Sequence, residues 1–434
     1  MTVRFTPEGF ELDGQARRFV CGLIPFTHLP PDRWDMALDR ARELGLSGVA
    51  LDLVWRTHER SPGRLDLGGA RGLGRFLARV RAHGLWAAVR LGPFFPAEQG
   101  LGLPERVLAD PACQARDDAG RPRWLPVPWR LVPVPALGSP ALLSALLGWF
   151  GAAAEALARE AHPAGPVLAL GLDLGAADPF GAPAAGELLD AAARLGACLR
   201  SRLPGLPVLH GLPAWMPPDS ARVLAGLADG LGAPLDLGRP ELAQIAARAA
   251  RIVDAGAGAR PLLGLPLAAG CPIFGRPRGL DDQVFCALAG LMHGMNGFVL
   301  ETLVGRPGWT GAPVRPDLSL DAERADWVRR TLRLLERLSA WRPRGSGLGV
   351  PGGPDLAWAW HGPQALPDGQ RPDELGGLGP GCLWLANPAP GPRRARLRLG
   401  GARLFDLWRQ REFGGAEGDL ELAPFSLRPL EVRR

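Results

Sequence analysis

Several carboxylates in this sequence end or follow short apolar runs, where they could serve acid–base or nucleophilic chemistry. Glu301 interrupts the apolar run Phe298–Leu303. A buried carboxylate without a partner is costly, so Glu301 needs either an arginine partner or a catalytic task. Asp173 and Asp236 share the pattern Leu-Asp-Leu-Gly and are candidates for an acid pair. Three further acids stand at or near the ends of such runs: Asp52, Glu59 and Glu98.

Tryptophans occur where they could form the walls of a binding site. Trp124 and Trp129 lie in a long proline-rich stretch, residues 97–139, and Trp309 follows the run that holds Glu301. An indole ring suits the apolar C–H face of a sugar. The alternative is that these rings only pack loops onto the rest of the protein.

The sequence predicts no metal site and no cofactor. The six cysteines are scattered without the short C-x₂-C spacing of zinc or redox sites, so we interpret them as free thiols. The seven histidines are equally dispersed. The glycine pair Gly68-Gly69 is too short to indicate a phosphate loop.

The elements that must position these residues alternate between two patterns. Eight nearly continuous apolar runs, typical of buried parallel strands, are each followed by a segment of helical period. This alternation predicts a TIM barrel over residues 1–341, with function at the carboxyl ends of its strands. The predicted strands are Phe19–Phe26, Gly48–Trp55, Leu85–Phe95, Pro166–Gly175, Pro207–Trp215, Gly232–Gly238, Pro261–Ala269 and Gly297–Val304. The predicted helices are Pro31–Gly45, Ala70–His83, Pro140–Ala161, Ala184–Arg202, Asp219–Ala228, Pro240–Ala255, Leu280–His293 and Leu320–Trp341.

The pattern changes after Trp341. Residues 342–353 are rich in glycine and proline and are predicted to be a linker. Short alternating runs separated by turns then predict a small β-sandwich over residues 354–434. We therefore expect an α/β protein with a TIM barrel and a C-terminal β-sandwich.

Composition narrows the function classes. The chain has 434 residues, 47% of them hydrophobic and 22% charged, so it can bury a core and is not mainly disordered. The net charge is +6, but the 50 basic residues are interspersed with 44 acidic ones and form no basic run. This pattern argues against nucleic-acid binding. We see no secretory signal and no membrane span, and expect a cytoplasmic protein that could form a homo-oligomer.

Three motifs in the first part of the chain have a recognisable spacing. The first runs from Cys21 to Trp34 and includes Gly22 and Pro30. The second has its characteristic residues at Trp34, Gly45-Leu46, Leu53, Trp55, His58-Glu59, Gly63, Asp66, Gly69 and Phe76. The third is Val89-Arg90-Leu91-Gly92-Pro93-Phe94-Phe95-Pro96-Ala97-Glu98. In order and spacing these motifs resemble glycoside hydrolase family 35, the β-galactosidase family.

This resemblance implies a retaining β-galactosidase. In that family a glutamate at the end of the fourth strand protonates the glycoside, and one at the end of the seventh strand attacks it. The sequence departs from that pattern. The fourth strand ends in Gly171-Leu-Asp-Leu-Gly175, where a gapless alignment puts Gly175 at the acid/base and a two-residue deletion puts Asp173 there. We prefer the deletion because it keeps the strand facing. The seventh strand has Pro266 at the nucleophile position.

The resemblance also suggests roles for other residues. It implies that Glu98 bonds sugar hydroxyls beside Ala97, and it places Asp52 and Arg56 where the family has tyrosine and asparagine. His58-Glu59 is expected to pack the base of the site. We predict Asp173 and Glu301 as catalytic residues and a carbohydrate as the ligand. The predicted substrate-binding residues are Asp52, Trp55, Ala97, Glu98, Asp236 and Trp309.

Two functions stay open at this point. One is a divergent β-galactosidase-like glycoside hydrolase that acts on the terminal sugar of a β-glycoside. The other is a catalytically silent relative that binds carbohydrate or serves as a scaffold. In either case we expect ordinary β-galactosidase activity to be very weak or absent, because proline and glycine stand where the family has its glutamates.

Overall fold

The structure is a computed structural model of the whole chain, and it describes residues 3–7, 9–61, 63–68, 72–95, 98–127, 130–173, 184–213, 215–235, 261–268, 279–350, 353–363, 380–387, 389–398, 403–413 and 417–433. The chain divides into two units. The barrel unit comprises Met1–Pro234, Asp254–Pro277 and Gly297–Asp321, and the second unit comprises Leu235–Val253, Arg278–Asn296 and Ala322–Arg434.

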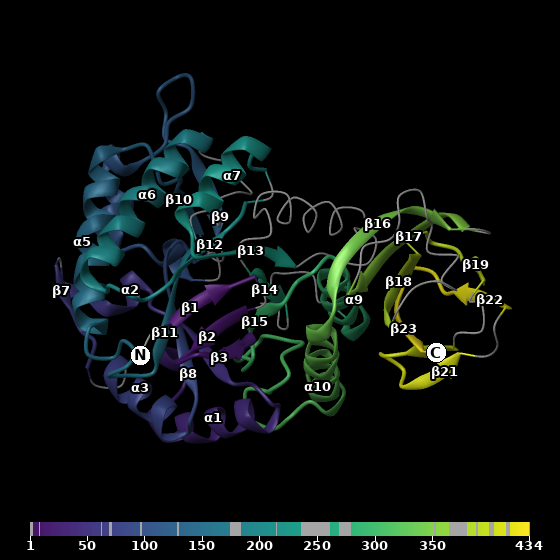
Figure 1. Cartoon of the computed structure of the whole chain (residues 1–434). Helices are drawn as coiled ribbons and strands as arrows, with labels where there is room; N and C mark the ends of the chain where they lie inside the picture. Colours follow the sequence, from purple (N-terminus) through teal and green to yellow (C-terminus); the bar gives the residue numbers. More distant parts are fainter. Residues whose placement is uncertain are drawn as a thin grey trace. The chain divides into compact units, whose positions relative to one another are not determined.

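Eight parallel strands close into a barrel in the barrel unit, which confirms the predicted TIM barrel (Figure 1). Their order around the barrel is β11-β12-β13-β14-β15-β4-β5-β8. Each overlaps one of the eight predicted runs. The strands are β4 (Phe19–Leu23), β5 (Gly48–Asp52), β8 (Trp86–Pro93), β11 (Val167–Asp173), β12 (Val208–Gly211), β13 (Gly230–Leu235), β14 (Leu262–Ala268) and β15 (Gly297–Glu301).

Long helices follow the strands along the chain, as the sequence pattern predicts. They are α1 (Trp34–Glu43), α3 (Leu73–Ala82), α5 (Pro140–Leu157), α6 (Ala185–Arg202), α7 (Pro218–Leu227), α9 (Leu280–Met292) and α10 (Ala322–Arg337). The predicted helix Pro240–Ala255 lies outside the described residues. Within the described part, α5 is the one helix long and apolar enough to span a membrane, but half of it is buried in the protein.

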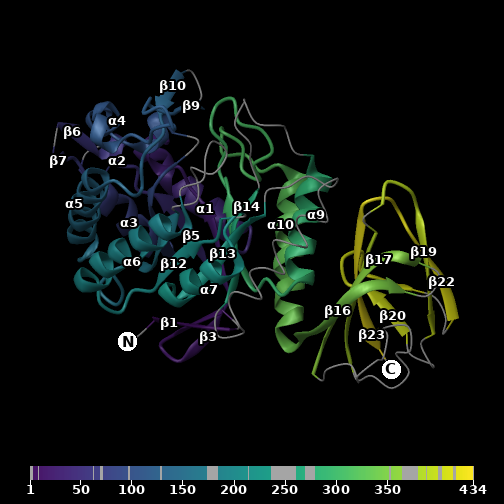
Figure 2. The same cartoon turned by 90° about the horizontal axis from the view of Figure 1, so that it is seen from above.

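Short elements lie at both ends of the barrel. The sheet β1 (Val3–Thr6), β2 (Gly9–Leu12) and β3 (Gln15–Arg17) lies at one end, and the hairpin β9 (Trp124–Val127) and β10 (Arg130–Pro133) lies at the other with α4 (Glu105–Ala109) (Figure 2). The remaining short elements of the barrel unit are η1 (Phe26–His28), η2 (Pro31–Arg33), α2 (Trp55–His58), β6 (Glu59–Ser61), β7 (Arg64–Leu65), η4 (Gln99–Gly102) and η5 (Pro111–Cys113).

Side chains rather than a channel fill the barrel. Phe10 from β2, Phe19 from β4 and Trp86 from β8 pack together near the strand starts, with ring centroids 4.9–6.1 Å apart. Glycine makes room for these rings, because a Cβ on Gly48 would lie 2.3 Å from the Trp86 ring. This packed floor leaves the opposite end of the barrel for a site.

The second unit contains the predicted β-sandwich. A six-stranded sheet has the order β16-β17-β18-β23-β20-β21, and β19 pairs with β22. Leucines from both sheets form one buried core around Trp360, and α9 contacts β23. The elements are η8 (Leu338–Ala340), β16 (Arg342–Val350), β17 (Gly353–Gly362), β18 (Gly381–Asn387), β19 (Arg393–Arg398), β20 (Arg403–Asp406), β21 (Arg411–Phe413), β22 (Glu417–Leu422) and β23 (Ser426–Arg433).

The predicted linker is wrong over most of its length. Residues Arg342–Val350 form the edge strand β16 and pair antiparallel with β17. Ladder hydrogen bonds come from the backbone, so a glycine-rich segment can join a sheet despite its low strand propensity. An edge strand also tolerates Pro343, which has no N–H to donate.

Candidate functional site

Three of the predicted carboxylate positions end strands of the barrel. Asp52 is the last residue of β5, Asp173 of β11 and Glu301 of β15. Because all eight strands are parallel, these residues stand at the same end of the barrel, which we call the mouth. It is the end at which TIM-barrel enzymes place their active sites.

Arg90 joins two of these acids into one cluster. Its Nε and Nη2 donate to the two carboxylate oxygens of Asp52 at 2.6 and 2.9 Å, and its Nη1 donates to Oε2 of Glu301 at 2.7 Å. The side chains of Asp52 and Arg90 are 13% and 16% exposed, and that of Glu301 is 26% exposed. We call these three residues the central cluster.

The position of Arg90 follows from its strand and its neighbours. Arg90 lies in β8 between β5, which carries Asp52, and β11. A Cβ on Gly171 of β11 would lie 3.1 Å from Cγ of Arg90, so the glycine leaves space for the arginine stem. The side chain reaches Glu301 although β15 is separated from β8 by two strands in the barrel order.

The electrostatics of the central cluster follow from burial and pairing. Desolvation by burial raises the pKa of the Asp52 carboxyl, and the charge of Arg90 opposes that rise. Desolvation alone would lower the pKa of Arg90, but Asp52 and Glu301 together raise it well above its usual value. Arg90 therefore stays charged and compensates both carboxylates.

A second group of charges surrounds Glu98. Arg306 Nη1 lies 2.7 Å and His28 Nε2 lies 3.3 Å from Oε1 of Glu98, whose side chain is 13% exposed. Although burial favours the neutral acid, hydrogen bonds and charge from these two partners lower the pKa of Glu98. The guanidinium of Arg306 also lies 5.0 Å from the ring centre of the half-buried Trp309. We call His28, Glu98 and Arg306 the rim cluster.

Trp55 is buried against other side chains. It is 3% exposed, stacks on Trp149 at 5.7 Å and lies 5.2 Å from the guanidinium carbon of Arg106. This burial leaves little of the ring exposed, and the substrate contact of Trp55 stays a prediction.

The pair His58-Glu59 has the expected packing role. His58 is fully buried, and its Nδ1 lies 3.1 Å from the Asp66 carbonyl oxygen. Glu59 accepts from Arg106 at 2.8 Å, and the neighbouring Arg56 donates to Glu105 at 2.9 Å. His58, Glu59 and Arg56 thus each bond to another part of the protein.

Several predicted residues cannot be placed in the site. The side chain of Asp173 is outside what the structure describes, although its backbone ends β11 and pairs with Pro93. Ala97 and Asp236, predicted to bind substrate, lie outside the described residues, as does Trp129. Trp124 is 55% exposed. Pro266 lies within β14, whose seven residues include no carboxylate.

Sequence reasoning missed the cations of the site. Arg90, Arg306 and His28 hold the carboxylates, yet none was singled out as a site residue. The available signal for Arg90 was the same as for Glu301, because a lone charge in an apolar strand needs a partner. Among the described residues no group of histidine, cysteine and acid side chains could hold a metal ion.

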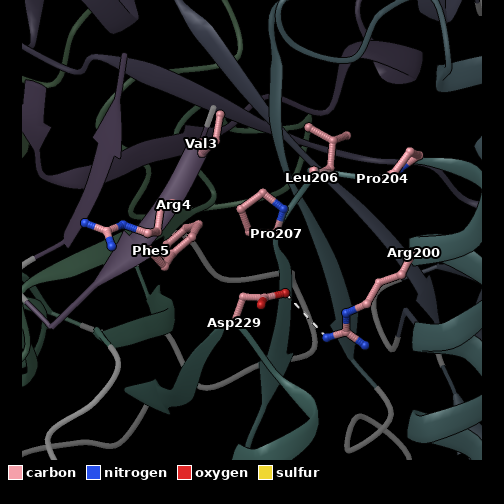
Figure 3. A pocket seen from close by; sticks show the side chains of 9 residues that line it. Val3, Arg4, Phe5, Arg200, Pro204, Leu206, Pro207 and Asp229 are labelled. Carbon is pink, nitrogen blue, oxygen red and sulfur yellow. Dashed lines mark hydrogen bonds and ion pairs between the residues drawn. The ribbon is translucent and has the colours of Figure 1, made fainter. Parts of the chain in front are cut away.

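A cavity of about 500 Å³ lies at the other end of the barrel (Figure 3). Val3 and Phe5 of β1 line it together with residues that precede β12 and β13. Its Asp229 is 3.4 Å from Arg200 and accepts from the Val208 amide. The cavity is thus separate from the mouth and contains none of the predicted site residues.

Comparisons with known proteins agree with the motifs. Residues 9–121 match the sequence model of glycosyl hydrolases family 35. Rice Beta-galactosidase 12 (Oryza sativa subsp. japonica) is 32% identical over 100 residues, which are 23% of this chain and 11% of that protein. The mouse (Mus musculus) Beta-galactosidase-1-like protein is 33% identical over 108 residues, 25% of this chain and 17% of that protein. The matches thus span less than a fifth of these relatives.

Solved structures resemble this chain in fold over a larger part of its length. The β-galactosidase from Bacillus circulans sp. alkalophilus has a TM-score of 0.61 at 9% identity and covers 95% of this chain and 98% of that one. The β-galactosidase from the psychrophilic Marinomonas ef1 has a TM-score of 0.59 at 14% identity, over 74% of this chain and 60% of that one. The resemblance to glycoside hydrolase family 35 is therefore confirmed through residues 9–121, on a barrel fold that β-galactosidases share.

Proposed function

We propose that the mouth of the barrel binds the terminal sugar of a β-glycoside and that the protein is a divergent β-galactosidase-like glycoside hydrolase. Glu301 carries the proposal. Its Oε2 is fixed by Arg90, whereas its Oε1 has no hydrogen-bond partner among the described residues. A carboxylate held on one side and open on the other can accept a sugar hydroxyl or face an anomeric carbon.

The proposed chemistry needs a second carboxyl group. Asp173 ends β11, and we assign it the proton donation to the leaving oxygen while Glu301 stabilises or attacks the anomeric carbon. Glu98 is assigned to the sugar hydroxyls and Trp309 to the apolar face of the sugar. Aspartate is one methylene shorter than glutamate, so the donor is set back and turnover should be slow.

Hydrolysis of nitrophenyl β-galactoside by the purified protein tests this function. We expect weak turnover that falls about 10²-fold or more in both Asp173→Asn and Glu301→Gln, the range that general acid–base catalysis supplies. The matched control is Asp190→Asn, which removes an exposed carboxylate paired with Arg194 on α6. Unchanged turnover in both site variants would show that the assigned residues are wrong.

A second function is favoured by one observation. Arg90 binds both described carboxylates of the central cluster, and β14 offers none, so the pair of acids that hydrolysis needs is incomplete among the described side chains. The protein would then bind a sugar without cleaving it. Galactose binding at millimolar concentration without turnover supports this second function, and absence of both contradicts the two proposals together.

A further inference from the structure

The central cluster contains a residue whose role differs from the one that the sequence suggests. Both carboxylate oxygens of Asp52 accept from Arg90, at 2.6 and 2.9 Å, and the side chain is only 13% exposed. A buried carboxylate with both oxygens bonded to an arginine has few free acceptor positions for a ligand. Glu301 is twice as exposed and gives only one oxygen to Arg90.

The contacts therefore lead from Asp52 through Arg90 to Glu301, which is the most exposed of the three side chains. Asp52 binds the Nε and Nη2 edge of the guanidinium in two parallel hydrogen bonds, which fixes the plane of the group. The remaining Nη1 then points to Oε2 of Glu301. Arginine has five donors in a rigid fork, so anchoring one edge determines where the other nitrogen lies.

We propose that Asp52 is a positioning residue that acts through Arg90, and that this pair fixes the place of Glu301 at the mouth. The inference concerns the same site as the proposed function and deepens it. It replaces the predicted contact between Asp52 and a substrate with an indirect role.

The contacts around Glu301 set the expected effects. Arg90 holds Glu301 through one hydrogen bond, and Asp52 holds Arg90 through two. Arg306 also acts on Asp52 electrostatically and is itself bound to Glu98, which His28 contacts. The described charges of the mouth are thus Asp52, Arg90, Glu301, Arg306, Glu98 and His28.

Two substitutions should therefore both release Glu301. Arg90→Gln removes the group that bonds Glu301 directly, and Asp52→Asn removes the anion that fixes the plane of the Arg90 guanidinium. The Glu301 carboxyl should become more mobile in both variants. If the role of Asp52 ended at its own contact with Arg90, Asp52→Asn would leave the mobility of Glu301 unchanged.

The mobility of Glu301 can be read without any ligand. Carbon-13 NMR relaxation of the side-chain carboxyl groups in glutamate-labelled protein resolves Glu301 as the signal that is lost in Glu301→Gln. The parent, Arg90→Gln, Asp52→Asn and the control Asp190→Asn are compared at one pH, and near-ultraviolet circular dichroism checks that each is folded. If Arg90→Gln does not fold, Arg90→Lys keeps a cation but loses the fork, and it should also raise the mobility of Glu301.

The outcomes separate this inference from the proposed function. A more mobile Glu301 in Asp52→Asn, with an unchanged control, supports the positioning role, whether or not galactose binds. A Glu301 that is as immobile in Asp52→Asn as in the parent would overturn it. Absence of galactose binding in the folded parent would count against the proposed function alone.

Discussion

The need of Glu301 for a partner was predictable, but the identity of the partner was not. A charge inside an apolar strand must be compensated. The sequence therefore indicated either a structural ion pair or a catalytic task for Glu301. The structure shows the ion pair with Arg90, 211 positions away in the chain. Which arginine reaches it depends on how the strands are ordered and staggered in the closed barrel, and no local pattern encodes that.

His210 offers a test of burial at the level of one residue. It lies in β12, is 1% exposed, and its Nε2 has no hydrogen-bond partner among the described residues. Desolvation, helped by the charge of Arg200, lowers its pKa from 6.5 to about 4. The unfolded chain therefore takes up a proton more readily than the folded one between these two values.

Stability should consequently be highest above about pH 6.5 and should fall as the pH is lowered toward 4. For this histidine the free energy of unfolding should fall by about 2 kcal/mol between pH 7 and pH 5. His210→Leu should remove that part of the pH dependence. Urea unfolding followed by tryptophan fluorescence at both pH values measures it. An equal loss in parent and variant would contradict the account.

At the scale of elements, the barrel strands and most of its helices could be predicted because each is a local pattern. The continuous apolar runs became β4, β5, β8, β11, β12, β13, β14 and β15. The edge strand β16 could not, because glycine and proline in Arg342–Val350 indicate a linker when the sheet partner is unknown. Its pairing is decided by β17 and not by its own side chains.

Glycine is required inside the barrel where a large side chain crosses a neighbouring strand. Gly48 of β5 faces the Trp86 ring, with three ring atoms within 2.5 Å of the position of an added Cβ. Gly48→Ala should lower the free energy of unfolding by about 1–3 kcal/mol, as overpacking of a core does. Urea unfolding measures the change.

Gly148→Ala is the matched control for this substitution. Gly148 lies exposed in α5, and an added Cβ there would meet nothing within 4 Å. Because alanine has the higher helix propensity, this variant should gain up to about 1 kcal/mol. A Gly48→Ala protein as stable as the parent would show that the barrel floor is packed less tightly than described.

At the scale of the whole molecule, the family likeness and the proposed site overlap only in part. Residues 9–121 contain Asp52, Arg90 and Glu98, whereas Glu301, Arg306 and Trp309 lie beyond the matched segment. The matched part therefore contains Asp52, Arg90 and the proposed sugar contact Glu98, whereas the proposed reacting groups Asp173 and Glu301 end later strands. This division explains why the motifs indicated a resemblance to β-galactosidases without by themselves specifying the carboxylates.

The position of a bound sugar tests the central claim most directly. A crystal of the protein soaked with galactose should show the sugar at the mouth, with a hydroxyl within hydrogen-bond distance of Glu301 Oε1 or Glu98 and with Asp52 still bound to Arg90. A galactose molecule in the cavity lined by Val3 and Phe5, or none at millimolar concentration, would contradict the claim that the mouth is a carbohydrate site.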